Sequence, residues 1–503
     1  MSIKDKALKW WVEKTERDEY VASSNELPPQ RQREALVKDK FLCHLIKGYW
    51  ILKRPEDETR EIFLLLYWQI IEKVLSRFSC WSFRGRSALK ILDGDQTPQK
   101  HLLVRTKKKT NRKLLLPTGF DVFLVYDPNF DERLVKKIEI AGRNIPVDIP
   151  EKVLIDASKL KPSLEVRSFI AGTSFDLRIL EAIYAKKPKP IVFKRLADMA
   201  KDAGRPDLAS NIEKIIETYT HYRVSKKKKI EPKLIAKKAV VTPSWVIRQE
   251  RQLQEFEKTL EKHFAAKIKE IKKRPLEQLL SQAKEHKKYD TYHSTTLEGY
   301  RITPEEVEVL LSGALSKTKK AQGYNNVEKI KNRMAILGYS AAFDFVIKKI
   351  QEDFGQQEIS ENFIKDIYHH LFKPSADAGI IDYLSLVSYR TVPAFIRGTQ
   401  YVPPSYEKLS ELMDSYVFSM NKIRNPIVKA VLAHYFFVTI HPYSDGNGRT
   451  ARLLMNYLLL TAGYPWVTIR VDNRVKYFEA LRKGQLDGNI LAFGDFIFKV
   501  IES

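Results

Sequence analysis

The chain has 503 residues, which at about 150 residues per domain suggests about two to four domains. A hydrophobic fraction of 44% excludes a disordered chain, and two cysteines, Cys43 and Cys80, are too few for a disulfide framework or a cysteine-rich zinc site. Of the net charge of +25, +18 falls in residues 1–240, so that half either binds a polyanion or carries a solvated basic surface.

The sequence shows neither the pattern of a signal peptide nor that of a membrane-spanning helix. The N-terminus is charged and lacks the apolar stretch of a signal peptide. The longest apolar run, residues 62–71, is well short of the roughly 20 residues that cross a bilayer. We therefore expect a soluble, cytoplasmic protein without a membrane partner.

Residues 1–95 have the pattern of a small winged-helix-like region. Apolar positions predict a helix that includes residues 35–46 and stops at Gly48, followed by an aromatic strand over 49–52. A second, buried helix is expected near residues 61–78, and a basic aromatic segment follows at 81–84.

Residues 96–222 are predicted to form a mixed β/α domain. Short apolar runs separated by turn residues predict strands at 102–104, 114–116, 122–125 and 138–140, and helical patterns resume from Pro150. Residues 105–113 carry a cluster of lysines and arginines. They are expected to form a hairpin tip that either contacts phosphates or is simply solvated.

A short strand running into a helix is the pattern of residues 145–156, where Pro150, Glu151 and Lys152 begin the helix. Together with the aromatic strand and the segment 81–94, it resembles the AbiEi-type transcriptional regulator and antitoxin family over about residues 33–220. Lys152 stands where that family has an arginine. The resemblance implies a winged helix followed by a mixed β/α domain, with DNA as a partner.

Residues 223–242 are interpreted as a basic linker. Eight basic side chains face one acidic one in residues 223–238, so this segment either tracks a polyanion or is a solvated spacer. Connecting helices are expected over 243–289, beginning with a long amphipathic helix.

The segment most informative about chemistry is residues 441–452, a polar loop that lies between two apolar helical stretches. Gly446 and Gly448 permit close approach of a ligand to the backbone at a helix N-terminus, where free N–H groups bind anions. Arg449 and Arg452 lie on one side of the first helical turn and can hold phosphate oxygens. The alternative is a polar loop with no ligand.

Two further residue types complete this pattern. Asp445 can hold Mg²⁺ that also bridges phosphates, and His441 suits the role of a general base for a hydroxyl nucleophile. The combination predicts a site for phosphoryl or nucleotidyl transfer.

This segment resembles the motif of the Fic family, His-x-Phe-x-(Asp/Glu)-Gly-Asn-Gly-Arg-x-x-Arg, with Tyr443 in place of Phe. The resemblance covers about residues 290–503 and implies an all-α Fic fold with a β-hairpin flap. It implies transfer of AMP from ATP to a Ser, Thr or Tyr hydroxyl of a protein. Gly448 favours nucleotidyl transfer, because the kinase-like Doc branch has lysine there.

The resemblance also assigns roles to individual residues. His441 is the base, Asp445 the Mg²⁺ ligand, and the phosphates are held by Gly446, Asn447, Gly448, Arg449, Thr450 and Arg452. Tyr477, Phe478 and Gln485 are placed on the adenine side, although Phe478 and Gln485 depart from the Tyr and Asn that are frequent there. The flap is placed at Phe395, Ile396 and Arg397.

An inhibitory segment is expected before the domain. Ser294, Glu298 and Gly299 fit the family's pattern (Ser/Thr)-x-x-x-Glu-(Gly/Asn), and a capping box with Pro304 follows at 303–306. The resemblance implies that Glu298 pairs with Arg452 and competes with ATP phosphates. A solvated glutamate at a helix end is the alternative.

We therefore expect a multidomain chain: 1–95 winged-helix-like, 96–222 mixed β/α, 223–242 linker, 243–289 connecting helices and 290–503 a Fic domain. The expected function is an adenylyltransferase autoinhibited by Glu298, with ATP and Mg²⁺ as cofactors. The alternatives are a DNA-binding regulator or toxin–antitoxin-like protein with a nucleotide-responsive module, a deAMPylase, or another nucleotidyltransferase. The oligomeric state stays open, a homodimer being one alternative.

Overall fold

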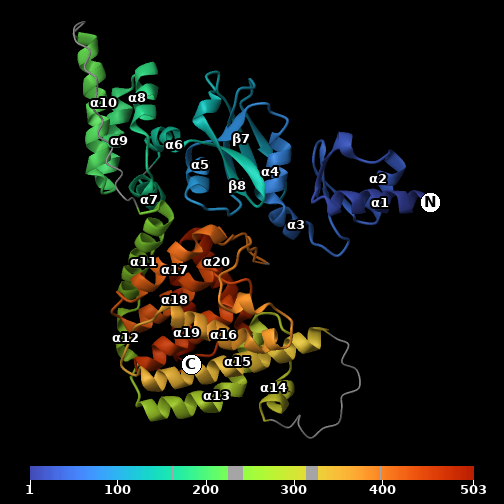
Figure 1. Ribbon diagram of the computed structural model, residues 1–503, viewed down its shortest axis with the longest axis vertical. Helices are drawn as coiled ribbons and strands as arrows, with labels where there is room; N and C mark the ends of the chain where they lie inside the picture. The colour runs from blue at the N-terminus through green and yellow to red at the C-terminus, as the bar shows by residue number, and fades with distance from the viewer. Residues whose placement is uncertain (161, 225–241, 313–326, 397, 503) are drawn as a thin grey trace. The chain divides into compact units, whose positions relative to one another are not determined.

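The computed structural model describes residues 1–160, 162–224, 242–312, 327–396 and 398–502 (Figure 1). They form two compact units, Met1–Arg248 with Phe395–Val402, and Gln249–Ala394 with Pro403–Ser503. The predicted basic linker falls almost entirely on 225–241, outside the described residues. The five-part division of the chain stays a prediction.

The first unit begins with a small αβ region. Its elements are α1 (Ile3–Glu16), β1 (Val21–Ser23), α2 (Gln30–Lys38), β2 (Leu42–Ile46) and β3 (Tyr49–Leu52). The strands form an antiparallel sheet in the order β1-β3-β2. Ala7, Leu36 and Leu52 are buried in a small core of this region. It holds together because helix and sheet each bury one apolar side.

A mixed six-stranded sheet follows in the order β6-β7-β5-β4-β9-β8. Two of its pairs, β5–β7 and β4–β9, are parallel, and the other pairs are antiparallel. Its strands are β4 (Trp81–Phe83), β5 (His101–Thr106), β6 (Arg112–Leu115), β7 (Asp121–Tyr126), β8 (Val135–Ile140) and β9 (Arg143–Asp148).

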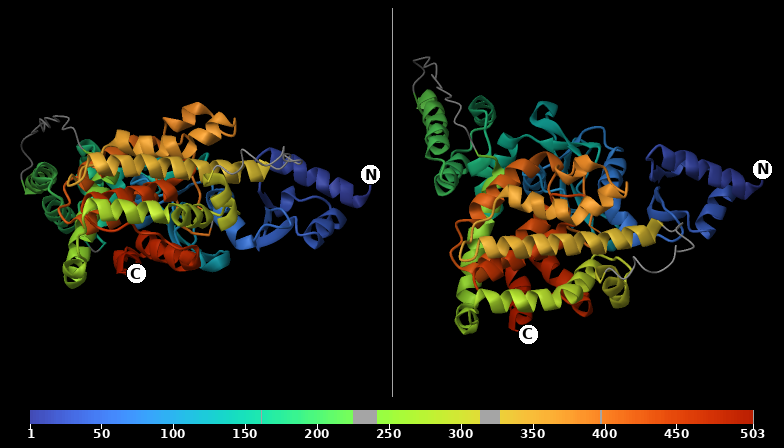
Figure 2. Two further views of the ribbon diagram at one scale, coloured as in Figure 1. Left: turned by 90° about the horizontal axis from the view of Figure 1, so that it is seen from below. Right: turned by 60° about the horizontal axis from the view of Figure 1, so that its bottom comes forward.

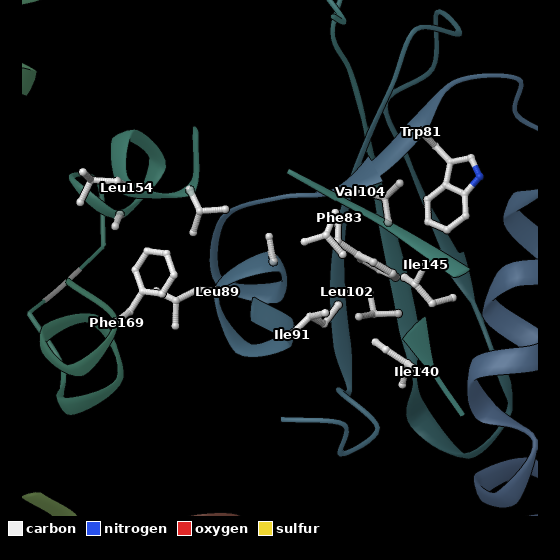
Figure 3. Packing of buried hydrophobic residues seen from close by; sticks show 14 of the residues in the cluster. Trp81, Phe83, Leu89, Ile91, Leu102, Val104, Ile140, Ile145, Leu154 and Phe169 are labelled. Carbon is white, nitrogen blue, oxygen red and sulfur yellow. The ribbon is translucent and has the colours of Figure 1, made fainter. Parts of the chain in front are cut away.

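Helices on either side bury this sheet. In Figure 1, α4 and α5 lie on its two sides, and both contact its strands. The core joins strand residues such as Phe83 and Val104 to helix residues such as Leu89, Leu154 and Phe169 (Figure 3). The helices of this part are α3 (Thr59–Leu65), α4 (Tyr67–Leu75), α5 (Gly85–Leu92), α6 (Pro150–Ala157), α7 (Leu164–Gly172), α8 (Leu177–Lys186), α9 (Pro190–Asp202) and α10 (Pro206–Val224).

The described residues of the second unit are helical, with short 3₁₀ turns and no strand. Its helices are α12 (Ala265–Glu270), α13 (Leu276–Leu297), α14 (Pro304–Leu311), α15 (Val327–Glu352), α16 (Glu361–Asp377), α17 (Leu409–Met420), α18 (Pro426–Ile440), α19 (Asn447–Thr461), α20 (Arg474–Asp487) and α21 (Ile490–Glu502). The helix α11 (Ser244–His263) begins in the first unit and continues into the second.

Two buried helices form the centre of this unit. Nearly every residue of α18 and α19 is buried, and the two helices pack against each other. Around them α16, α15 and α13 lie side by side (Figures 1 and 2). Asn425 caps α18, because its Oδ1 accepts hydrogen bonds from the N–H groups of Ile427 and Val428. A helix that is apolar on all sides needs such a packed environment.

Several sequence predictions differ from the structure in the first unit. The helix expected over 35–46 ends at Lys38, because Lys40 has a left-handed φ of 63°, and Leu42–Ile46 is a strand. The helix expected near 61–78 is interrupted at Leu66. The basic segment 105–113 is not a hairpin tip, because β5 and β6 are not neighbours but flank β7.

The flap predicted around Phe395 also differs. The described residues between Tyr389 and Val402 contain no strand, so the expected β-hairpin is not formed there. Arg390 is buried and uses its guanidinium to bind backbone carbonyls at Val392, Pro404 and His441, which favours an irregular course for this segment. Among the described residues, none of the helices combines the length and apolar character needed to cross a membrane.

Candidate active site

Residues 441–446 connect the two buried helices α18 and α19. His441 ends α18 with a left-handed backbone, φ 54° and ψ 58°, and Gly446 precedes α19 with φ 78°. Two left-handed positions so close together turn the chain sharply. They leave the first N–H groups of α19 without intrahelical acceptors.

His441 presents a neutral imidazole at this turn. Its Nδ1 lies 3.3 Å from the carbonyl oxygen of Val438. Burial lowers the pKa of His441 to about 4; the bond to Val438 opposes this shift, and the nearby Arg390 reinforces it. With Nδ1–H donated to Val438, the unprotonated Nε2 is the ring atom that can accept a proton.

The loop is held by Arg390, a buried residue that was not among the predicted site residues. Its Nε donates to the carbonyl of His441 at 2.8 Å, and its N–H donates to the carbonyl of Pro442 at 2.9 Å. The contact joins positions 51 residues apart, so no local sequence pattern could reveal it.

Tyr443 anchors the loop in the core. Its ring stacks on Tyr368 with centroids 3.6 Å apart, and Asn447 clamps its backbone from both sides, with bonds of 3.0 Å to its N–H and 2.7 Å to its carbonyl. Among the described residues, the hydroxyl of Tyr443 has no hydrogen-bond partner. The side chain of Asn447 therefore shapes the loop, a role the sequence did not suggest.

The two glycines stand where side chains would collide. A Cβ on Gly446 would lie 2.3 Å from the Phe372 ring, and one on Gly448 would lie 2.1 Å from Oε1 of Glu298. Close approach at Gly448 brings a carboxylate over the N-terminal turn of α19. That position is where a helix N-terminus attracts negative charge.

Arg449 is a buried cation between aromatic faces. It is 1% exposed, and its guanidinium carbon lies 4.9 Å from the ring centres of both Tyr300 and Phe372. Its Nη2 contacts Asp445 Oδ2 at 3.2 Å, and Tyr300 donates to the same oxygen at 3.0 Å. Tyr300 was not predicted as a site residue, although it follows Gly299 directly.

Asp445 fits the role of a single protein ligand to Mg²⁺. Its side chain is 55% exposed, so it can reach a bound ion. The described residues contain no cluster of three His, Cys, Asp or Glu side chains that could hold a metal alone. Mg²⁺ at nucleotide sites characteristically takes one or two carboxylates and completes its shell with substrate oxygens and water.

Arg452 pairs with Glu298, the pairing that the family resemblance implied. Nη2 of this arginine, which is 3% exposed, lies 2.7 Å from Glu298 Oε1. Ser294 adds two acceptors, its Oγ at 2.8 Å from Nε and its carbonyl at 2.9 Å from Nη2. Burial alone would lower the pKa of Arg452, but the Glu298 carboxylate raises it above the ordinary value.

The segment containing Glu298 has the predicted local structure. Glu298 is the C-cap of α13, and Gly299 follows with φ 93°. The next helix, α14, begins with the predicted capping box of Thr303 and Glu306. The structure thus brings Ser294 and Glu298 to the motif, across about 150 positions of sequence.

Residues predicted on the adenine side occupy different environments. Tyr477 is buried and its hydroxyl lies 3.0 Å from His434 Nε2, whereas Phe478 is 36% exposed beneath the guanidinium of Arg474. Gln485 donates to the Thr439 hydroxyl at 3.2 Å. Among these residues, Phe478 has the more exposed aromatic ring, and the guanidinium of Arg474 lies over it.

Two other predictions concern Thr450 and the flap. Thr450 is fully buried, and its N–H bonds the carbonyl of Gly446, so neither its side chain nor its N–H is available to a phosphate. Phe395 and Ile396 belong to Phe395–Val402, which groups with the first unit, and Arg397 lies outside the described residues.

Comparison with known proteins gives a family for this region. Residues 358–459 match the profile of the Fic/DOC family. The chain is 32% identical over 212 residues to the Protein adenylyltransferase Fic of Aedes aegypti, covering 41% of this chain and 38% of that protein. It is 32% identical over 215 residues to the protein of that name from Nematostella vectensis, covering 42% and 46%. The chain thus spans less than half the length of these curated relatives.

Among solved structures, one similar protein is a Fic-domain-containing signaling protein from Bacteroides thetaiotaomicron. It is 23% identical, covers 50% of this chain and 93% of its own, and has a TM-score of 0.37.

Proposed function

We propose that this chain, whose residues 358–459 match the Fic/DOC family, is a protein adenylyltransferase that moves AMP from ATP to a Ser, Thr or Tyr hydroxyl and is restrained by Glu298. The observation that carries the proposal is the arrangement at one turn: a neutral imidazole, a helix N-terminus without a side-chain cap, and two buried arginines. The names of the curated relatives support the same reaction.

His441 supplies the proton acceptor of this reaction. Nε2 takes the proton of the acceptor hydroxyl while that oxygen attacks the α-phosphorus of ATP. The bond from the α-phosphorus to the bridging oxygen breaks, and pyrophosphate leaves with that electron pair. The bond to Val438 keeps the ring in the tautomer that leaves Nε2 unprotonated.

The phosphates are assigned to the first turn of α19. The N–H groups of Asn447, Gly448 and Arg449 face the ligand, and the helix dipole favours its charge. Arg449 and Arg452 hold the outer phosphates through their forked donors. Asp445 would hold Mg²⁺, which when bound neutralises developing phosphate charge.

Glu298 restrains the reaction in this proposal because it occupies the phosphate position. Its Oε1 lies against Gly448 and bonds Arg452, so it takes a donor that ATP needs and repels the anion. Removing the carboxylate frees both the space and the arginine.

The test is transfer of α-labelled ATP by wild type, Glu298→Gly and the double variant Glu298→Gly/His441→Ala. We expect label on protein to rise at least tenfold with Glu298→Gly and to vanish in the double variant, because a positioned base contributes roughly 10²–10⁴-fold. Glu277→Gly, at the far end of α13, is the matched control and should leave labelling unchanged.

Two results would count against the proposal. Equal labelling by wild type and Glu298→Gly would contradict the inhibitory role of Glu298. Labelling that persists in the double variant would contradict the role of His441 as the base. Competition by unlabelled GTP, CTP and UTP distinguishes AMP transfer from transfer of another nucleotide, and release of label from modified protein identifies a deAMPylase.

A second candidate function, DNA binding, is favoured by the small αβ region at residues 3–52. Its helix α2 exposes Arg31 and Lys38, and the turn between β2 and β3 exposes Lys47. A short exposed helix and a hairpin turn carrying cations can each contact phosphates.

DNA binding is tested with the full chain by fluorescence anisotropy of a labelled duplex at increasing salt. Replacing Arg31, Lys38 and Lys47 together by alanine should reduce affinity and flatten the salt dependence. The matched control replaces exposed lysines of the second unit, Lys262, Lys272 and Lys284. Equal losses in the two triple variants would show nonspecific attraction by net charge.

A further inference from the structure

Tyr300 contacts the candidate metal ligand from outside the motif. Its hydroxyl donates to Oδ2 of Asp445 at 3.0 Å, and Nη2 of Arg449 donates to the same oxygen at 3.2 Å. Nη2 of Arg449 also lies 3.3 Å from the hydroxyl oxygen of Tyr300, so the three side chains form a closed ring of hydrogen bonds. The proposed reaction does not use this tyrosine.

The direction of the bond between Tyr300 and Asp445 follows from their protonation. Burial raises the pKa of Tyr300, while the charge of Arg449 opposes this rise and that of Asp445 adds to it. The phenol is therefore protonated near neutral pH and donates, whereas an ionised carboxylate only accepts. The proton of the hydroxyl is committed to Asp445, and a lone pair of the same oxygen accepts from Arg449.

These contacts occupy most of the Asp445 carboxylate. Oδ2 accepts two hydrogen bonds, from Tyr300 and Arg449, and Oδ1 accepts one of 2.6 Å from the N–H of Gly446. A carboxylate offers about four lone-pair positions, so most of those of Asp445 are in use. A metal ion can therefore reach Oδ2 only if one of the two donors leaves that oxygen.

The ring of Tyr300 is fixed by contacts that do not involve Glu298. It packs against a small core that includes Ile302, and the guanidinium carbon of Arg449 lies 4.9 Å from its centre. The side chain of Asp445, in contrast, is 55% exposed and has room to turn. Separation of the hydroxyl from Oδ2 is therefore a movement of Asp445 away from a fixed donor, and it costs the energy of that hydrogen bond.

We infer that Tyr300 sets the Mg²⁺ requirement of the site: its hydroxyl competes with the metal ion for Oδ2 of Asp445 and so weakens binding of nucleotide together with Mg²⁺. Tyr300 acts through Asp445 and is a positioning residue. The inference rests on the proposed function for the role of Asp445. It gives the segment after α13 a second restraint, which acts on the metal ligand, whereas Glu298 acts on Arg452.

The test uses the full chain carrying Glu298→Gly, which leaves the Tyr300 contact as the restraint to be measured. Calorimetry gives Kd for an ATP analogue with carbon in place of the oxygen between the α- and β-phosphorus, so that no transfer occurs. The ratio of Kd in EDTA to Kd in excess Mg²⁺ measures the enhancement by the metal. Tyr300→Phe keeps the ring and should raise this ratio roughly three- to tenfold, the effect of one hydrogen bond, with Kd in EDTA changed by less than about twofold.

Tyr457→Phe is the matched control. It removes another hydrogen bond from a tyrosine to a carboxylate, the 2.8 Å contact with Asp353, from the part of α19 that lies far from the motif. It should lower the melting temperature and leave the ratio unchanged. When Asp445→Asn is present, Tyr300→Phe should no longer change the ratio, because both substitutions act on one contact.

Binding and transfer separate this inference from the proposed function. An unchanged ratio in Tyr300→Phe would overturn the inference, and so would a smaller ratio, because the hydroxyl would then orient Asp445 for the metal. An effect of Tyr300→Phe that persists with Asp445→Asn would also overturn it. A ratio that responds as expected in a chain that transfers no label would refute the proposed function alone. Absence of nucleotide binding, or binding that Mg²⁺ does not affect in any variant, would refute both.

Discussion

Two arginines of one helix are buried by different means. Arg449 lies between the rings of Tyr300 and Phe372, whereas Arg452 is held by carboxylate and hydroxyl acceptors of α13. Aromatic faces hold a cation without occupying its donors, although Nη2 of Arg449 also bonds Asp445 and Tyr300. The donors of Arg452 are bonded to acceptors on Ser294 and Glu298. A change on α13 should therefore affect Arg452 first.

The environment of His441 predicts an unusual pH profile. Its pKa is lowered to about 4, so the neutral ring persists well below pH 6.5, where an ordinary histidine is half protonated. In the Glu298→Gly variant, kcat/KM should stay flat from pH 8 to about pH 5.5 and fall only as pH approaches the lowered pKa. Initial rates of label transfer across this range measure the profile.

Circular dichroism at each pH is the control, because acid unfolding would imitate loss of the base. An acid limb centred near pH 6.5 in a folded protein would mean that the ring is solvated in the reacting state. Retention of the limb in Glu298→Gly/His441→Ala would assign it to another group.

At the scale of elements, the turn between α18 and α19 depends on a glycine that cannot be replaced. Gly446→Ala should destabilise the second unit strongly, because alanine is strained at φ 78° and its Cβ would meet Phe372 at 2.3 Å. The strain costs roughly 1–2 kcal/mol, and the overlap adds about 1–3 kcal/mol. Thermal unfolding gives the difference.

Gly488→Ala is the matched control for this substitution. Gly488 has φ 70° at the end of α20, but nothing lies within 4 Å of a Cβ placed there. It should show the backbone strain alone. Equal loss of stability in both variants would mean that the Phe372 ring moves aside without cost.

Elements were predictable where the determinants are local. The polar loop, its flanking helices and the capping box at Thr303 follow from periodicity, glycines and caps in neighbouring positions. The strand β2 was predicted as a helix, because its apolar residues allow either form and only pairing with β3 decides. The basic segment 105–113 connects β5 and β6, which do not pair because β7 lies between them. This strand order cannot be read from the local sequence.

The site residues also divide into those that the local sequence reveals and those that it does not. His441 to Arg452 could be recognised as one pattern, and the pairing of Glu298 with Arg452 followed from the family resemblance. Two supports of that pattern, Arg390 and Tyr368, come from distant parts of the sequence and act by a hydrogen bond to a backbone carbonyl and by ring stacking. Such contacts depend on the fold and leave no mark in residue type or spacing.

At the scale of the whole molecule, the chain has two units with separate cores. Leu154 is buried in the core of the first unit and Leu454 in α19 of the second, each with no exposed surface. Units with their own cores are expected to unfold as separate cooperative transitions. Calorimetry of the full chain should therefore show two transitions.

Core substitutions assign the two transitions. Leu154→Ala should lower one midpoint and Leu454→Ala the other, each by the roughly 2–5 kcal/mol that a buried leucine contributes. ATP added to the Glu298→Gly variant should raise only the midpoint that Leu454→Ala lowers, since ligand stabilises the unit that binds it. A single transition that both substitutions displace equally would show that the two units unfold together. ATP would then raise the midpoint of that one transition.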